Sequence, residues 1–214
     1  MKNNYKLLNT ALILAAITII YNIAEGLISV YFGIEDESLS LFGFGFDSFV
    51  EVVSGIGIFH LILRIKNNGN ENRDEFEKTA LLITGTGFFI LTAGITLTAL
   101  YNFYINHKPE TTVLGIIISV VSIITMSILI HYKLDIGNKL KSSALIADAN
   151  CTKTCLYLSI VLLIASVGYE LTGFGGIDSL GGLAIAWFSF KEGREAFEKA
   201  KTGKNCGCDD HCAS

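Results

Sequence analysis

The sequence is poor in charge and in proline, and its charged residues are unevenly spread. Charged residues make up 17% of the 214 residues and there is one proline, whereas soluble domains carry roughly 25% charged residues. The small charged fraction argues against a soluble domain, and the net charge of −4 gives no sign of a nucleic-acid surface. Long uncharged stretches lie between short charged strips. Since about 20 apolar residues match a hydrocarbon core of roughly 30 Å, we expect an integral membrane protein.

Three other patterns are missing. The apolar runs lack the alternation of barrel strands, so helices, which satisfy their backbone hydrogen bonds internally, are expected to span the bilayer. The first run, from about Leu7 to Phe32, is too long for a signal peptide and has no small-residue cleavage site. The five cysteines form two tight groups that do not resemble a secreted disulfide framework, which leaves metal ligation or free thiols.

The apolar runs predict an all-α membrane protein, a bundle of six transmembrane helices. The expected spans are residues 7–32, 40–63, 79–101, 112–131, 142–168 and 177–190. Residues 1–190 would form the transmembrane domain, and 191–214 a cytoplasmic helical extension with a cysteine-rich tail. Apart from Lys108 and Lys153, the basic residues lie near the N-terminus, between spans two and three, between spans four and five, or in the tail. The positive-inside rule therefore places both termini in the cytoplasm of a multi-pass protein, which we expect in a plasma membrane of prokaryotic type.

Two expected spans carry ionisable residues that lipid disfavours. Span two contains Asp47 and Glu51, and span five contains Asp148, Cys151 and Cys155. A charge at the bilayer centre costs at least about 2.5–3.5 kcal/mol on insertion scales, so such residues indicate a functional site. Residues three or four apart share one helix face. Each span therefore presents its polar residues on one side.

These two faces would form one metal site if spans two and five are neighbours. Because the spans run in opposite directions, Asp47 is expected level with Cys155, and Glu51 level with Cys151. Two carboxylates and two thiolates suit tetrahedral zinc, and the thiolates favour cadmium or mercury over magnesium or calcium. Four ionised groups would repel one another, so the empty site should hold protons that metal binding releases. We expect no prosthetic group besides the transported ion.

The remaining polar residues of the spans have several interpretations. A single membrane cysteine is usually a small packing residue. Asp148 could be an additional metal or proton group. Glu25 could pair with Asn22 at a helix interface or act as a second ion or proton group. His60 and His131 lie near predicted cytoplasmic helix ends and are interpreted as interfacial side chains.

The C-terminal tail is a second candidate metal site. It holds Cys206, Cys208, His211 and Cys212, whose thiols and imidazole suffice for a soft metal ion. An unstructured polar terminus is the alternative. We hypothesise that the tail collects cytosolic metal and feeds the membrane site.

The residues around the intramembrane acids resemble a known family. The segment Ser38–Glu51, with two acids four residues apart, resembles the second helix of the cation diffusion facilitators. The segment Ala144–Ala149, followed by Cys151 and Cys155, is similar to their fifth helix, which usually carries His or Asp and then Asp at that spacing. Asp178, which opens a glycine-rich last helix, also fits the family.

The resemblance implies proton-coupled export of zinc or a similar ion, usually by a homodimer with alternating access. It makes Asp47, Glu51, Cys151 and Cys155 the transport-site ligands. The two cysteines depart from the family pattern and add cadmium, mercury and copper(I) to the candidate substrates. Family members commonly carry a further cytoplasmic domain. We expect a short form without it, which would dimerise through its transmembrane helices.

Two other functions fit the same residues. A membrane metal sensor or storage protein would bind the ion without moving it. A thiol oxidoreductase would use Cys151 and Cys155, but the usual redox spacing is Cys-x-x-Cys and cysteines at mid-membrane are poorly placed for thiol exchange. We therefore expect a transporter and not an enzyme.

Deleting residues 205–214 tests the role predicted for the tail. Metal flux should fall at low metal concentration, because collection of the ion becomes slower, and should be normal at saturating metal. Flux into vesicles, measured across a metal concentration series, checks this. Equal flux at every concentration would remove the tail from the mechanism.

Overall fold

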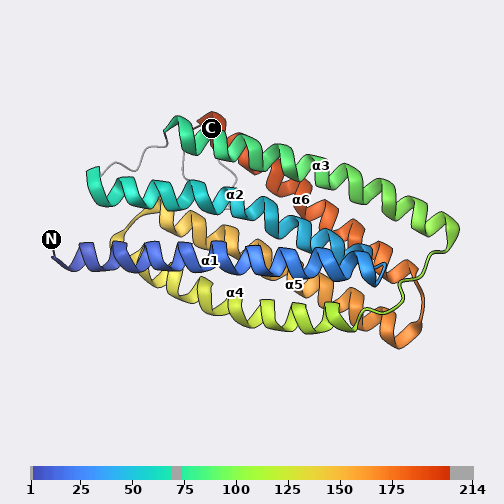
Figure 1. Ribbon diagram of the computed structural model, residues 1–214. Coiled ribbons are helices and arrows are strands. Elements are labelled where there is room, and N and C mark those ends of the chain that lie inside the picture. The colour runs from blue at the N-terminus through green and yellow to red at the C-terminus, as the bar shows by residue number, and fades with distance from the viewer. Residues whose placement is uncertain (1, 69–73, 203–214) are drawn as a thin grey trace.

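The computed structural model describes residues 2–68 and 74–202, which form a bundle of six long helices (Figure 1). The helices are α1 Lys2–Glu35, α2 Leu39–Asn68, α3 Glu75–Ile105, α4 Val113–Leu140, α5 Ser143–Thr172 and α6 Gly176–Thr202. The prediction of an all-α six-helix bundle is confirmed. The predicted tail site at Cys206, Cys208, His211 and Cys212 lies outside the described residues.

Successive helices run in opposite directions along the bundle. The connections from α1 to α2, from α3 to α4 and from α5 to α6 lie together at the right in Figure 1. The start of α1 and the end of α6 consequently lie toward the opposite end, as an even number of spans requires. The most extensive contacts join α1 to α2, α3 to α6 and α4 to α5, while α2 also touches α3, α5 and α6. Helices α2 and α5, whose polar faces carry the predicted site, are therefore neighbours.

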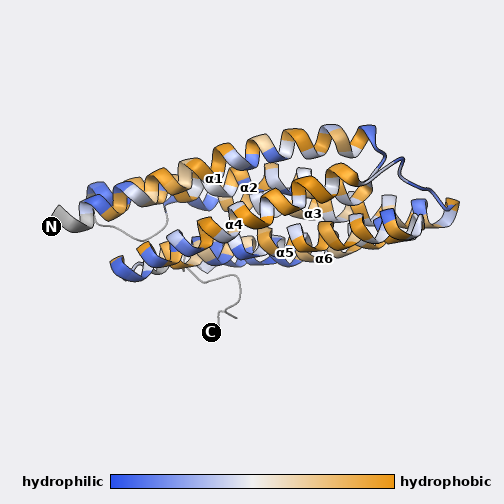
Figure 2. Cartoon of the chain, turned by 90° about the horizontal axis from the view of Figure 1, so that it is seen from below, coloured by the Kyte–Doolittle hydropathy of each residue, from blue (hydrophilic) through white to orange (hydrophobic). Residues whose placement is uncertain are grey.

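The helices have the length and composition of membrane spans. Among the described residues, five helices, α1 to α5, meet the length and hydropathy expected of a bilayer-crossing segment. Helix α6 differs because its second half is rich in charge, so its apolar part is short. Within the described residues it continues without a break from the predicted sixth span into the first part of the predicted extension, as far as Thr202. Figure 2 shows hydrophobic residues over the middle of the bundle and hydrophilic residues toward its ends.

Helices α1 and α2 approach closely where glycine replaces larger side chains. A Cβ atom on Gly45 would lie 2.6 Å from the Ser29 Cβ, and one on Gly33 would lie 2.5 Å from the Phe42 backbone nitrogen. Small residues at a membrane helix interface allow such contact. This approach fixes the height of the α2 acids relative to the polar residues of α1.

A buried carboxylate joins the start of α6 to the start of α2. Asp178 is 2% exposed. Its carboxylate accepts hydrogen bonds from the Ser38 hydroxyl at 2.8 Å, the Leu39 N–H at 2.8 Å, and the N–H and hydroxyl of Ser40 at 3.2 and 2.5 Å. The backbone donors belong to the first turn of α2, which has no partners within its own helix. Asp178 therefore caps a neighbouring helix and sets where α2 begins.

Replacing Asp178 with alanine should destabilise the bundle. The change leaves buried hydroxyl and N–H donors without their acceptor, and we expect the free energy of unfolding to fall by about 2–4 kcal/mol. Denaturant titration of the protein in detergent micelles measures this loss.

Asp135→Ala is the matched control. Asp135 is exposed and pairs with Lys139 one turn away at 2.6 Å, and such surface pairs contribute about 0.5 kcal/mol or less. Equal losses in the two variants would show that the Asp178 contacts do not hold the bundle together.

Candidate functional site

The acids of α2 point into the bundle and bind different helices. Asp47 is 3% exposed, and its carboxylate accepts a hydrogen bond from the Ser189 hydroxyl of α6 at 3.0 Å. The Glu51 carboxylate accepts one from the Asn22 side-chain amide of α1 at 3.0 Å and one from the Cys155 thiol of α5 at 2.7 Å. Glu51 thus joins three helices at one point.

The contact between Glu51 and Cys155 differs from the predicted register. We expected Glu51 level with Cys151, and Asp47 level with Cys155, but the structure brings Glu51 to Cys155. Helix α5 ends at Thr172, whereas the predicted span ended at residue 168. Helix α2 also extends beyond its predicted span, to Asn68, and the ends of two helices do not fix which of their residues lie level with one another.

Cys151 faces the charged half of α6. It is partly buried, and the ammonium group of Lys199 donates a hydrogen bond to its sulfur at 3.3 Å. The same ammonium lies 3.7 Å from a carboxylate oxygen of Glu195, one turn earlier on α6. Lys199 is 6% exposed, so its charge is enclosed between α5 and α6.

Asp148 lies in an ion pair with α4. Its carboxylate is 3.0 Å from the ammonium group of Lys133, which also donates to the Thr152 hydroxyl at 3.0 Å. Lys133 is 6% exposed. Asp148, predicted as an additional metal or proton group, is therefore paired with the Lys133 ammonium in the described conformation.

Glu25 is buried between α1 and α2 and does not pair with Asn22. Its carboxylate accepts hydrogen bonds from the Tyr21 hydroxyl at 2.9 Å and from the Ser48 hydroxyl at 3.1 Å. The predicted pair is wrong, because the Asn22 amide instead reaches across to Glu51. The Asn22 carbonyl oxygen is buried and has no hydrogen-bond partner within the described part of the chain. An unused buried acceptor is costly unless it binds something.

A cavity of about 60 Å³ connects most of these groups. Residues from all six helices line it, including Asn22, Glu51, Cys151, Cys155 and Lys199. Three of the four predicted ligands thus face one shared space, whereas Asp47 is not among the lining residues. The space is large enough for a few water-sized molecules and has both polar and apolar walls.

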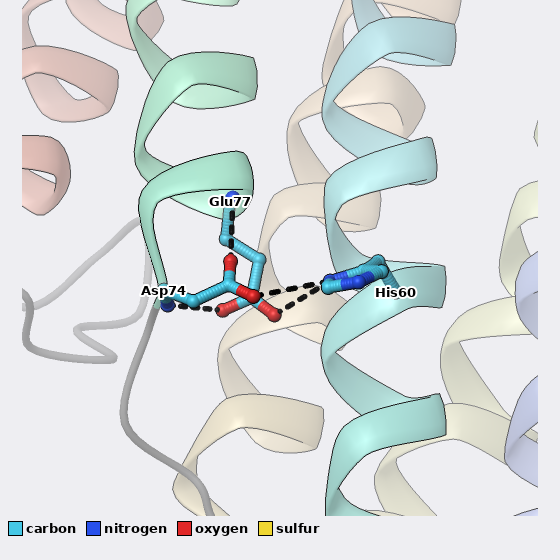
Figure 3. Close-up of side chains that lie close together, drawn as sticks. All are labelled: His60, Asp74 and Glu77. Atoms are coloured by element: carbon cyan, nitrogen blue, oxygen red, sulfur yellow. Dashed lines mark hydrogen bonds and ion pairs between the residues drawn. The ribbon is translucent and has the colours of Figure 1, made fainter.

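The predicted ligands do not form a closed coordination sphere in this conformation. Within residues 2–68 and 74–202, the three potential ligands whose binding atoms all lie within 4.8 Å of one another are His60, Asp74 and Glu77 (Figure 3). This group lies at the other end of α2 from Asp178, where α2 meets the start of α3. It is separate from the cavity.

Hydrogen bonds and a guanidinium group already satisfy the His60 cluster. Asp74 caps α3 by accepting from the Glu77 N–H at 3.0 Å, and the Glu77 carboxylate accepts from the Asp74 N–H at 3.0 Å. The Arg64 guanidinium lies 2.9 Å from Asp74 and 3.3 Å from Glu77, and His60 lies 3.0 Å from Glu77. A metal would have to displace the guanidinium, so we interpret the cluster as an ion-paired clasp between α2 and α3.

The Asp74 carboxylate is held in its ionised form. Partial burial acts to raise its pKa, but the Glu77 N–H, the Arg64 guanidinium and His60 outweigh burial and lower the pKa below its ordinary value. The Asp74 carboxylate is therefore expected to stay charged at neutral pH.

Sequence reasoning missed several partners of the predicted ligands. Ser189 and Lys199 come from α6, and Lys133 comes from α4. One signal was present: Glu192, Ala196 and Lys199 are spaced four and three apart, so they share one face of α6. That face lines the cavity.

The comparisons with known proteins agree with this architecture. Residues 11–202 match the family model described as the cation efflux transmembrane domain. The chain belongs to the cation efflux family. Its members are transporters and not enzymes. The resemblance to the cation diffusion facilitators and the prediction of a multi-pass integral membrane protein are confirmed.

One curated relative is also named as a transporter. The chain is 27% identical over 176 residues to an uncharacterized transporter of Methanocaldococcus jannaschii. The alignment covers 79% of this chain and 61% of the relative. The chain thus spans less than two thirds of that relative's length.

The His60→Ala variant tests the interpretation of the clasp. Because Arg64 and hydrogen bonds already satisfy the two acids, the number of Cd²⁺ ions bound per chain should not change. Equilibrium dialysis of the purified protein measures this number, with Arg64→Ala as a comparison that opens the cluster. Loss of one bound ion in His60→Ala alone would identify the cluster as a metal site.

Proposed function

We propose that this cation efflux family member is a secondary transporter that exports a soft divalent metal ion, zinc foremost, in exchange for protons. The observation that carries the proposal is the contact between Glu51 and Cys155 inside a cavity lined by all six helices. A carboxylate within a membrane-spanning helix is costly unless it has a function.

The donor set fits zinc or cadmium. Cys151 and Cys155 supply sulfur, and Glu51 supplies a carboxylate oxygen. The Asn22 side-chain amide already binds Glu51, and its carbonyl oxygen, which has no partner among the described residues, offers a further neutral oxygen. Zinc accepts such mixed sets, and the sulfurs disfavour magnesium and calcium.

The same contact supports exchange with protons. The Cys155 thiol donates a hydrogen bond to the Glu51 carboxylate at 2.7 Å, so one proton lies between the two groups. A metal ion that bound both groups would take the place of this proton, which would then leave the site. If a proton binds to these groups again, they bind the metal less tightly. The proton and the metal ion therefore compete for one position.

Asp47 does not line the cavity in the described conformation, so it can bind the metal only after a helix moves. It lies one turn from Glu51 on α2 and is held by Ser189 of α6. We propose that it joins the metal when α6 shifts and Ser189 releases it. Such a shift would couple binding to alternating access, and homodimerisation through the transmembrane helices is part of the same proposal.

Proteoliposomes that enclose a metal-sensitive dye test the proposal. Wild-type protein should carry Zn²⁺ or Cd²⁺ at a rate that depends on an imposed pH gradient. Glu51→Gln and Cys155→Ala should each lower this flux more than about tenfold, because each removes a ligand and a proton partner. The control is Glu198→Gln, an exposed carboxylate on α6.

Each result separates the candidate functions. Flux that responds to the pH gradient supports exchange. Tight metal binding without flux would instead indicate a sensor or storage protein, and undiminished flux in Glu51→Gln would contradict the proposed site.

A further inference from the structure

The ammonium group of Lys199 lies against one of the two sulfurs that line the cavity. Its ammonium group donates to the Cys151 sulfur at 3.3 Å, and both residues line the space that contains Glu51 and Cys155. A lysine that is only 6% exposed is uncommon, because burying a charge requires close partners. Here the partners include a candidate metal ligand.

The ammonium and a metal ion cannot both occupy this position. A metal bound to Cys151 would lie within a few ångströms of the Lys199 charge, and two cations at such a distance repel strongly where water is scarce. Binding of the metal to Cys151 therefore requires the ammonium to leave the sulfur. The competition for Cys151 is therefore between the ammonium group and the metal ion.

The structure provides a place for the displaced ammonium. Glu195 lies one turn before Lys199 on α6, and its carboxylate is already 3.7 Å from the ammonium group. Rotation of the flexible lysine side chain toward Glu195 would complete an ion pair of the common i, i+4 type. The move stays within α6 and needs no rearrangement of the other helices.

Lys133, the other buried lysine of the cavity, is placed differently. Its ammonium pairs with Asp148 at 3.0 Å and with the Thr152 hydroxyl at 3.0 Å. The contacts described for it involve neither cysteine. Lys133 is therefore interpreted as a fixed partner of Asp148, and Lys199 as the lysine that responds to the metal.

We propose that Lys199 is a tethered cation that occupies Cys151 in the metal-free cavity, gives way when the metal binds, and returns to help expel it. The inference rests on the proposed function, because it takes Cys151 as a ligand of the transported ion. It adds a residue that sets both affinity and release. While the ammonium group is bound to Cys151, it lowers the affinity of the site for the metal. When the ammonium group returns to Cys151, it speeds release of the metal.

The test measures Cd²⁺ binding and Cd²⁺ flux with the full chain at one pH. Cys206, Cys208 and Cys212 are replaced by serine in every variant, so that the tail offers no sulfur. Lys199→Met should bind Cd²⁺ about tenfold more tightly than the parent, because no ammonium competes for Cys151. Its maximal flux should fall several-fold, because release becomes slow. Lys199→Arg, which keeps the charge, should stay close to the parent.

Lys201→Met is the matched control. Lys201 is an exposed lysine on the same helix, and its removal should change neither affinity nor flux. Glu195→Gln provides a second test with the opposite sign, because without its alternative partner the ammonium stays on Cys151. Cd²⁺ binding should then weaken more than it does in Glu198→Gln.

The outcomes distinguish this inference from the proposed function. Unchanged or weaker Cd²⁺ binding in Lys199→Met, with a parent that binds and transports, would overturn the tethered cation and leave the transporter intact. Equal Cd²⁺ binding by the parent and by Glu51→Gln would instead overturn the transport site. Tighter binding together with slower flux supports both, and a purely structural role of Lys199 does not produce that combination.

Discussion

The hydrogen bond from Cys155 to Glu51 is the interaction on which the candidate site depends. Lipid supplies no partners for polar groups, so each carboxylate, thiol and ammonium in the spans must find one within the bundle. The pairing of Glu51 with Cys155 and Asn22 meets this requirement in the described conformation. The same groups are ligands for a soft metal ion. In the described conformation these ligands bind one another.

The position of this contact follows from features far from it. The close approach at Gly33 and Gly45 fixes α2 against α1, and the Asp178 carboxylate fixes the start of α2 against α6. Between α4 and α5, the Ser159 hydroxyl donates to that of Ser122 at 2.8 Å. Together these contacts set the heights of the helices that meet at the cavity. Because these contacts hold α2 in place, the Glu51 carboxylate lies at a defined position along the bundle.

Part of this arrangement could be predicted from the residues alone. The long uncharged runs predicted the helices, and the four-residue spacings placed Asp47 with Glu51 and Cys151 with Cys155 on single faces. The register between α2 and α5, in which Glu51 meets Cys155, could not be predicted, because spacing within each helix does not determine how far one helix is shifted along the other. Partners from other helices, such as Lys199, depend on packing that no spacing within one helix reveals.

Cadmium X-ray absorption spectroscopy shows whether Glu51 and Cys155 bind one metal ion. The protein should carry serine at Cys206, Cys208 and Cys212, so that Cys151 and Cys155 are its only sources of cysteine sulfur. A site formed by Glu51 and the two cysteines predicts a coordination sphere that contains both sulfur and oxygen, with fewer sulfurs after Cys155→Ser. A sphere of oxygen and nitrogen alone, unchanged by Cys155→Ser, would contradict it.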